Sequence, residues 1–154
     1  SGECTIPEFS LYLKHEYCLQ QQVINKYPLI LVLEDDVDLP FDFKNQIDNY
    51  IDEFLNYEFK LDILMLGSCC NLDAKNISKN KLIYFSETYK TRCTHAMIFT
   101  LDASTKIISY LSNVTYPIDH RLNQIIEKEN LKVAWAEPSI LQKTDLKIFN
   151  SSIR

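Results

Sequence analysis

The order of apolar and polar positions along the chain predicts strands and helices that follow one another. Short runs rich in apolar residues, typical of buried strands, lie at residues 29–33, 62–66, 82–85, 94–100 and 133–136. Apolar positions three and four residues apart predict helices over residues 11–25, 43–57, 103–111 and about 120–129. Strands alternating with helices indicate the α/β class with a mostly parallel sheet, in which the run at 29–33 is a central strand buried on both faces.

Three residues are expected at helix ends. Ser10 can accept a hydrogen bond from the first turn of the helix at 11–25, and Pro28 stops that helix. Asp119 precedes the helix at 120–129 and is well placed to cap it in the same way.

Composition and charge narrow the classes of function. The chain has 154 residues and a mass of 18.0 kDa, which suits one domain over residues 1–154, and 46% of its residues are hydrophobic. A net charge of −5 and scattered lysines disfavour a nucleic-acid-binding protein and one that binds anionic membranes. No apolar run reaches the ~20 residues of a membrane helix, and no signal peptide is recognisable. We therefore expect a cytoplasmic protein, at most peripheral to a membrane, and disfavour the ER lumen.

Cysteine and glycine usage limits the chemistry further. The five cysteines are an odd number and none shows CxxC spacing, so reduced thiols in a cytoplasm are the simplest interpretation, with an oxidising compartment as the alternative. Only two glycines occur, so a glycine-rich phosphate-binding loop is absent from this sequence.

The strongest chemical signal is an acidic cluster after the apolar run at 29–33. Glu34, Asp35 and Asp36 follow this run directly, and ligands of α/β sheets bind beyond the carboxyl ends of strands. On an extended chain Glu34 and Asp36 point to the same side, where their charges repel unless a cation lies between them. Oxygen ligands favour Mg²⁺ or Mn²⁺. The alternative is that these acids cap the following turn and face water.

Two metal-using families share this pattern of an apolar strand that ends in acids. One is the receiver domain of two-component signalling, which also needs a phospho-accepting aspartate at the end of a later strand. The equivalent run here, at 62–66, ends in Gly67, and a whole helix precedes the acidic strand. The receiver interpretation is therefore disfavoured.

The other family matches motifs along most of the chain. In order they are SLYLKH at 10–15, LVLEDDV at 31–37, DILMLG at 62–67, THAMI at 94–98, PID at 117–119, EPS at 137–139 with Gln142, and SSIR at 151–154. Over residues 8–154 the chain thus resembles the family 25 glycosyltransferases of lipooligosaccharide and collagen galactosylation.

The resemblance implies a GT-A-like, Rossmann-like α/β/α sandwich that transfers a sugar, with inversion, from a nucleotide-sugar donor of the UDP-sugar type. The acceptor would be a glycan, a lipooligosaccharide or another hydroxylated molecule. By position in the motifs, the metal ligands of Mn²⁺ or Mg²⁺ would be Asp36 and Glu34, the catalytic base would be Asp119, and the residues of the donor site would be Asp35, Lys14, His15 and His95.

The chain departs from the family pattern at its start. Family members begin with a strand and loop that grip the nucleobase, whereas this chain opens almost at the SLYLKH motif. The sequence therefore predicts that the N-terminal nucleotide-binding portion is lost, shortened or outside this chain. A non-catalytic GT-A-like domain that has lost donor binding is the alternative function.

Overall fold

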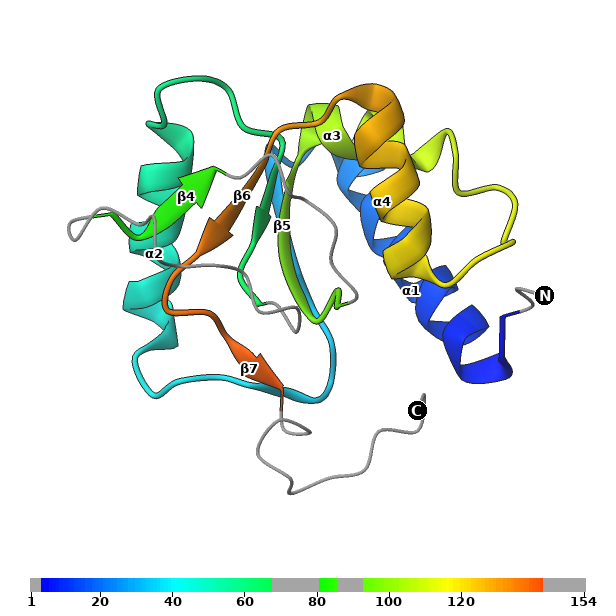
Figure 1. Cartoon of the computed structure of the whole chain (residues 1–154), viewed down its shortest axis with the longest axis horizontal. Helices are drawn as coiled ribbons and strands as arrows, with labels where there is room; N and C mark the ends of the chain where they lie inside the picture. The colour runs from blue at the N-terminus through cyan, green and yellow to red at the C-terminus, as the bar shows by residue number, and fades with distance from the viewer. Residues whose placement is uncertain (1–3, 68–80, 86–92, 143–154) are drawn as a thin grey trace.

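The computed structural model of the chain describes residues 4–67, 81–85 and 93–142, which form helices and strands packed in layers (Figure 1). The helices are α1 (Ile6–Asn25), α2 (Phe43–Leu55), α3 (Leu101–Ile108) and α4 (Ile118–Glu129). The strands are β1 (Leu29–Leu33), β2 (Val37–Asp38), β3 (Ile63–Met65), β4 (Ile83–Phe85), β5 (Ala96–Thr100), β6 (Val133–Ala136) and β7 (Leu141–Gln142).

The main sheet has five strands in the order β1-β5-β3-β6-β4 and is mostly antiparallel. Among the described strands, β3 and β6 are the only neighbours that pair in parallel, while β5 is antiparallel to β1 and β3 on its two sides and β4 is antiparallel to β6. The α/β class is confirmed, but the expected mostly parallel sheet is wrong. The physical reason is the insertion of β5 between two strands of the opposite direction.

The strand β1 lies at the edge of the sheet, where a central strand was expected. Its first three residues are only half-buried and Leu33 is exposed, so its apolar run reflects partial burial rather than cover on both faces. A second, two-stranded sheet pairs β2 with β7 and lies beyond the end of the main sheet (Figure 1). Two-residue strands are too short to leave a periodic pattern in the sequence, so this pair was not predicted.

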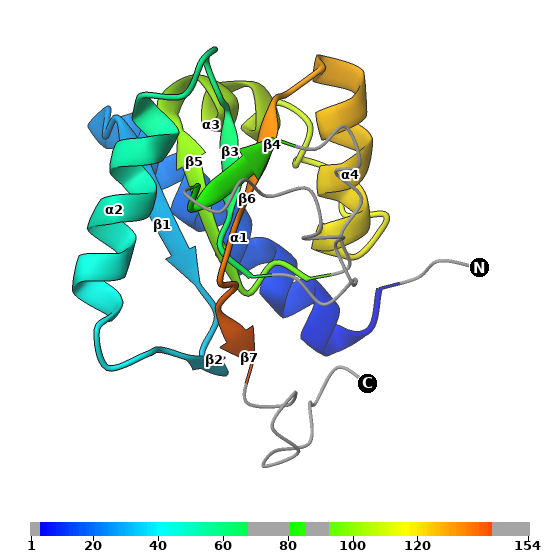
Figure 2. The ribbon, with the colours of Figure 1, turned by 60° about the vertical axis from the view of Figure 1, so that its left-hand side comes forward.

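Helices cover both faces of the main sheet. α1, α3 and α4 lie on one side and α2 lies on the other, as Figures 1 and 2 both show. Successive side chains of a strand point to opposite faces, so Ile63 and Met65 pack with the first group of helices while Leu64 packs with α2. The expected α/β/α sandwich is therefore present, with one apolar core on each side of the sheet.

Two of the expected helix caps are wrong. α1 begins at Ile6 because Thr5 forms a capping box with Glu8, so Ser10 lies inside the helix. α4 begins at Ile118 after Pro117, which places Asp119 in its first turn, where its Oδ1 accepts a hydrogen bond from the next backbone N–H. A carboxylate in this position still interacts favourably with the helix dipole.

Replacing Phe99 by Ala is expected to lower the free energy of unfolding by ~3–5 kcal/mol, since it removes a large side chain that is 0% exposed in the first core. The matched control is Phe41→Ala, because Phe41 is fully exposed and its loss should cost less than ~0.5 kcal/mol. Urea denaturation of both variants measures the difference. Equal losses would contradict the core described here.

Candidate functional site

The acidic cluster lies at the edge of the sheet where β1, β3 and β6 end and β5 begins. Because β5 is antiparallel to β1 and β3, the residues that open it lie beside those that close its neighbours. The backbone N–H of Glu34 donates to the carbonyl of His95 at 2.8 Å, and that of Ile140 donates to Leu66 at 2.7 Å. Segments from four parts of the chain thus meet around the acids.

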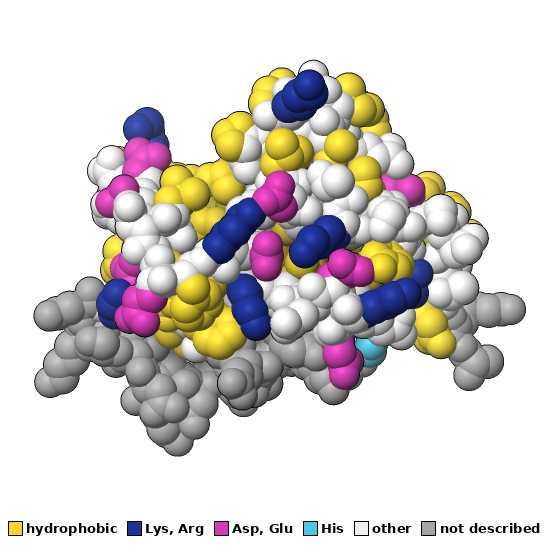
Figure 3. Space-filling view, turned by 90° about the horizontal axis from the view of Figure 1, so that it is seen from above, with side chains coloured by type: hydrophobic (Ala, Val, Ile, Leu, Met, Phe, Trp, Pro, Cys, Tyr) yellow, Lys and Arg dark blue, Asp and Glu magenta, His cyan; other side chains and the backbone are white. Residues whose placement is uncertain are grey.

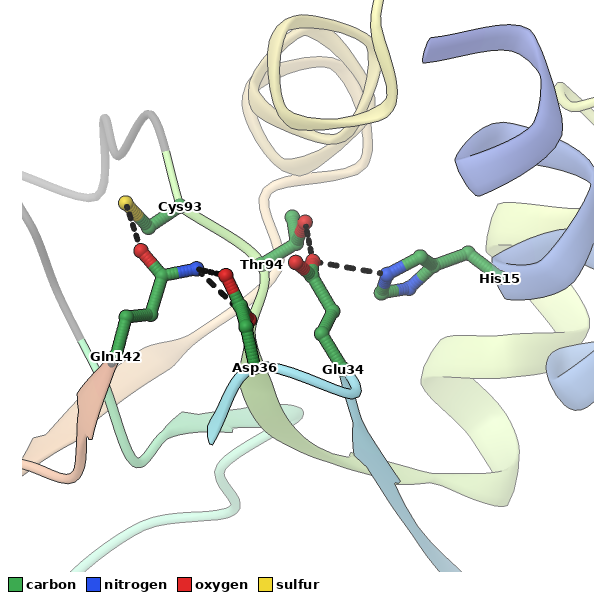
Figure 4. Close-up of polar contacts among 6 residues, drawn as sticks. All are labelled: His15, Glu34, Asp36, Cys93, Thr94 and Gln142. Atoms are coloured by element: carbon green, nitrogen blue, oxygen red, sulfur yellow. Dashed lines mark hydrogen bonds and ion pairs between the residues drawn. The ribbon is translucent and has the colours of Figure 1, made fainter. Parts of the chain in front are cut away.

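Glu34 is held by side chains from two other elements. The hydroxyl of Thr94, which precedes β5, donates to its Oε1 at 2.7 Å, and Nε2 of His15, on α1, lies 3.4 Å from the same oxygen (Figure 4). Burial, the largest influence, would raise the pKa of Glu34, but the contacts with His15 and Thr94 outweigh it and lower the pKa below its ordinary value. Glu34 is therefore favoured as a carboxylate.

Among the described residues, Asp36 has only a weak hydrogen-bond partner. The amide Nε2 of Gln142, on β7, donates to its two carboxylate oxygens at the long distances of 3.4 and 3.5 Å. Burial and then the nearby charge of Glu34 raise the pKa of Asp36. Of the two carboxylates, Asp36 is thus the one whose charge is least compensated by the described residues.

The two carboxylates share a side, but not for the expected reason. Residues 34–37 form a turn rather than an extended strand, with the N–H of Val37 donating to the carbonyl of Glu34 at 3.4 Å. Figure 4 shows both side chains rising from this turn toward Thr94 and Gln142. The turn brings the carboxylates together, and the expected extended geometry is wrong.

Of the four residues expected at the nucleotide-sugar site, two are exposed and two are buried. Asp35 and Lys14 are exposed, as a residue that meets a phosphate or a ribose must be. His15 is 2% exposed and His95 is 1% exposed, and the ring of His95 donates from Nε2 to the carbonyl of Ile140 at 2.9 Å. Both histidines are therefore buried against protein groups, His15 beside Glu34 and His95 against Ile140.

Asp119 lies apart from the acidic cluster. It is close enough to the start of α1 to raise the pKa of the Cys4 thiol, after the larger effects of burial and Glu8. No hydrogen bond or ion pair in the described part of the chain joins it to Glu34 or Asp36. On α1, Glu8 lies near Cys4 and Asp119, whereas His15 contacts Glu34. These two helix residues are seven positions apart, or about 10 Å along the helix axis.

Thr94 and Gln142 belong to the cluster although neither was predicted to contact the acidic residues. Both stood in the matched motifs, but their partners come from segments far along the chain. Next to them Cys93 takes part in a disulfide, and its Sγ lies 3.9 Å from Oε1 of Gln142. The expectation of reduced thiols holds for Cys4 and Cys18 but is wrong for Cys93.

The metal ligands that the acidic cluster can offer are carboxylate oxygens. Among residues 4–67, 81–85 and 93–142, no group of three or more His, Cys, Asp or Glu side chains is arranged to hold a metal ion. The cluster offers two neighbouring carboxylates, Asp36 and Glu34, whose mutual repulsion a cation would relieve. Oxygen ligands of this kind fit Mg²⁺ or Mn²⁺, which keep several waters when few protein groups bind them.

Glu34→Gln is expected to destabilise the fold in a pH-dependent way. The folded-state pKa of Glu34 lies below its ordinary value of 4.5, so its contribution to stability is present above pH 4.5 and is lost as the pH falls through the folded pKa. The difference in free energy of unfolding between wild type and variant should therefore shrink below pH 4.5. Urea denaturation at stepped pH measures it, with the exposed Glu58→Gln as control. A difference that does not change with pH would contradict the role given to His15 and Thr94.

The described surface shows no basic stripe in the view of Figure 3, where Lys and Arg side chains alternate with acidic and hydrophobic ones. Within the described part of the chain, no helix is long and apolar enough to cross a membrane.

No protein-family model matches the chain, and no curated protein matches it.

Proposed function

We propose that the chain is a glycosyltransferase that depends on a divalent cation and takes its sugar from a UDP-sugar donor. The observation that carries the proposal is Asp36, a carboxylate with a raised pKa and only long contacts to Gln142, placed where three strands end. Ligands of α/β sheets bind at such an edge. The motifs that resemble those of family 25 glycosyltransferases suggest the class of reaction.

Asp36 would be the principal metal ligand and Glu34 the second. Glu34 already accepts from Thr94 and contacts His15, so its position is fixed, whereas Asp36 has the greater need of a cation. When bound, Mn²⁺ or Mg²⁺ supplies positive charge that neutralises the negative charge of a leaving diphosphate.

Other residues of the chain would hold the substrates. The exposed Lys14 can donate to phosphate oxygens and the exposed Asp35 can accept from ribose hydroxyls. Asp119 would take the proton from the hydroxyl of a glycan, lipooligosaccharide or other acceptor. One base is sufficient for an inverting displacement.

A second candidate is a GT-A-like domain that does not bind a donor. The burial of His15 and His95 favours it, because these two residues were expected to touch the donor and contact protein groups instead. The three acids favour the enzyme, since a core fold needs none of them.

The cellular compartment in which the enzyme works is also part of this proposal. The composition predicts a cytoplasmic protein, but disulfides persist mainly in oxidising compartments, and Cys93 takes part in one. We therefore place the working compartment of the enzyme in an oxidising environment.

Calorimetric titration of UDP into the chain, with and without Mn²⁺, tests the function. The proposal expects binding that requires the metal. A folded chain that binds UDP neither with nor without Mn²⁺ would exclude the transferase and leave the non-binding domain as the function.

A further inference from the structure

We propose that His95 is a positioning residue that fixes the two segments carrying Asp36 and Gln142 relative to each other, and that it thereby sets the metal affinity of the acidic cluster. This role rests on the proposed function. It replaces the contact with the donor that the sequence motif suggested for His95.

His95 contacts both segments of the site, which also pair with each other through β2 and β7. The backbone carbonyl of His95 accepts from the N–H of Glu34 at 2.8 Å, which fixes the start of the turn that carries Asp36. Its ring Nε2 donates to the carbonyl of Ile140 at 2.9 Å, two residues before Gln142. The amide of Gln142 in turn faces Asp36. A shift of the His95 ring would thus move Gln142 relative to Asp36.

The position of the ring requires glycine at residue 67, two residues after the end of β3. A Cβ atom at this position would stand 1.8 Å from Nε2 of His95, so any side chain there must displace the ring. The absence of a side chain at Gly67 therefore lets the ring lie against the backbone and reach Ile140. This explains why the strand at residues 62–66 is followed by one of only two glycines in the chain.

His95 does not meet a substrate directly. Its side chain is 1% exposed, and its Nδ1 is buried without a hydrogen-bond partner among the described residues. Because Nε2 donates to a carbonyl, the neutral ring carries its proton on Nε2 and leaves Nδ1 as an acceptor. Neither nitrogen is placed to exchange a proton with a bound ligand.

The test is the affinity for Mn²⁺, measured by calorimetry alongside thermal stability. His95→Phe keeps the bulk of the ring but loses the donor to Ile140, and we expect it to weaken Mn²⁺ binding by ~10–100-fold, as loss of a group that orients a ligand does. His95→Gln can still donate to that carbonyl and should recover most of the affinity. Gly67→Ala keeps histidine at position 95 but forces its ring to move, so this variant should also weaken Mn²⁺ binding.

Gln22→Leu is the control for a purely structural effect. Gln22 is also a fully buried polar residue, and it donates to the carbonyls of Tyr27 and Phe99, away from the acidic cluster. Its loss should lower stability and leave Mn²⁺ affinity within about twofold of wild type. If folded His95→Phe or Gly67→Ala binds Mn²⁺ with wild-type affinity, the role proposed for His95 is wrong, while the proposed function still stands. Absence of Mn²⁺ binding by the wild-type chain would overturn the proposed function and this role together.

Discussion

Replacing Asp36 by Asn is expected to abolish sugar transfer and to weaken Mn²⁺-dependent UDP binding by at least ~100-fold while leaving the fold intact. The substitution removes the negative charge that attracts the cation but keeps nearly the same shape. The asparagine carbonyl can still accept from Gln142, so the contact between this turn and β7 is preserved. Because burial and Glu34 raise the pKa of Asp36, removing its charge should not lower the free energy of unfolding at neutral pH.

The matched control for this experiment is Asp38→Asn. Asp38 lies two residues further along, on β2, and its exposed side chain belongs to the same acidic stretch of sequence. The control separates loss of a ligand from a general loss of negative charge. Calorimetry with UDP and Mn²⁺ should show normal binding for this variant. Retention of activity by Asp36→Asn would show that the metal ligand lies elsewhere.

Asp119→Asn is expected to reduce turnover by roughly 10²–10⁴-fold, the usual contribution of a general base. Asparagine retains an oxygen that can accept from the N–H of His120, so the first turn of α4 should stay in place. The effect should appear in kcat, with the binding of UDP and Mn²⁺ unchanged, because Asp119 lies apart from the acidic cluster.

Asp102→Asn provides the comparison for Asp119→Asn. Asp102 also lies in the first turn of a helix, α3, where it pairs with Lys60 at the surface. Its replacement should change stability slightly and leave turnover unaltered. If Asp119→Asn likewise changes only the thermal stability, Asp119 is a helix-terminus residue and the base is another group.

Local pattern was sufficient to find the elements of the fold but not to pair them. Residues 29–33 and 133–136 were predicted as strands and match β1 and β6, because both are apolar runs between clear breaks. The direction of β5 was missed. A strand's own residues do not determine whether its neighbours run with it or against it. The antiparallel register appears only in the series of pairs from Leu29 with Thr100 to Leu33 with Ala96.

For the candidate site, too, the sequence predicted the local feature but not its long-range contacts. Glu34 and Asp36 were singled out because three acids end a strand, a purely local signal. The partners that determine their charge, His15 on α1 and Thr94 before β5, come from segments 19 and 60 residues away, which no local pattern connects. Burial was equally hidden, since the sequence does not show that the ring of His95 turns toward Ile140 instead of a ligand.

The order of the strands has a consequence for how this chain folds. No two strands that pair in the described ranges are consecutive along the chain, and the β1–β5 and β3–β6 pairs join residues 63 to 71 and 70 positions apart, respectively. The described strands therefore form no hairpin that could nucleate the sheet, and long loops must close before these strands pair. Such a high contact order belongs to chains that fold over milliseconds to seconds, with local helices forming ahead of the sheet. The acidic cluster, built where four distant segments meet, would be completed only in the last steps of folding.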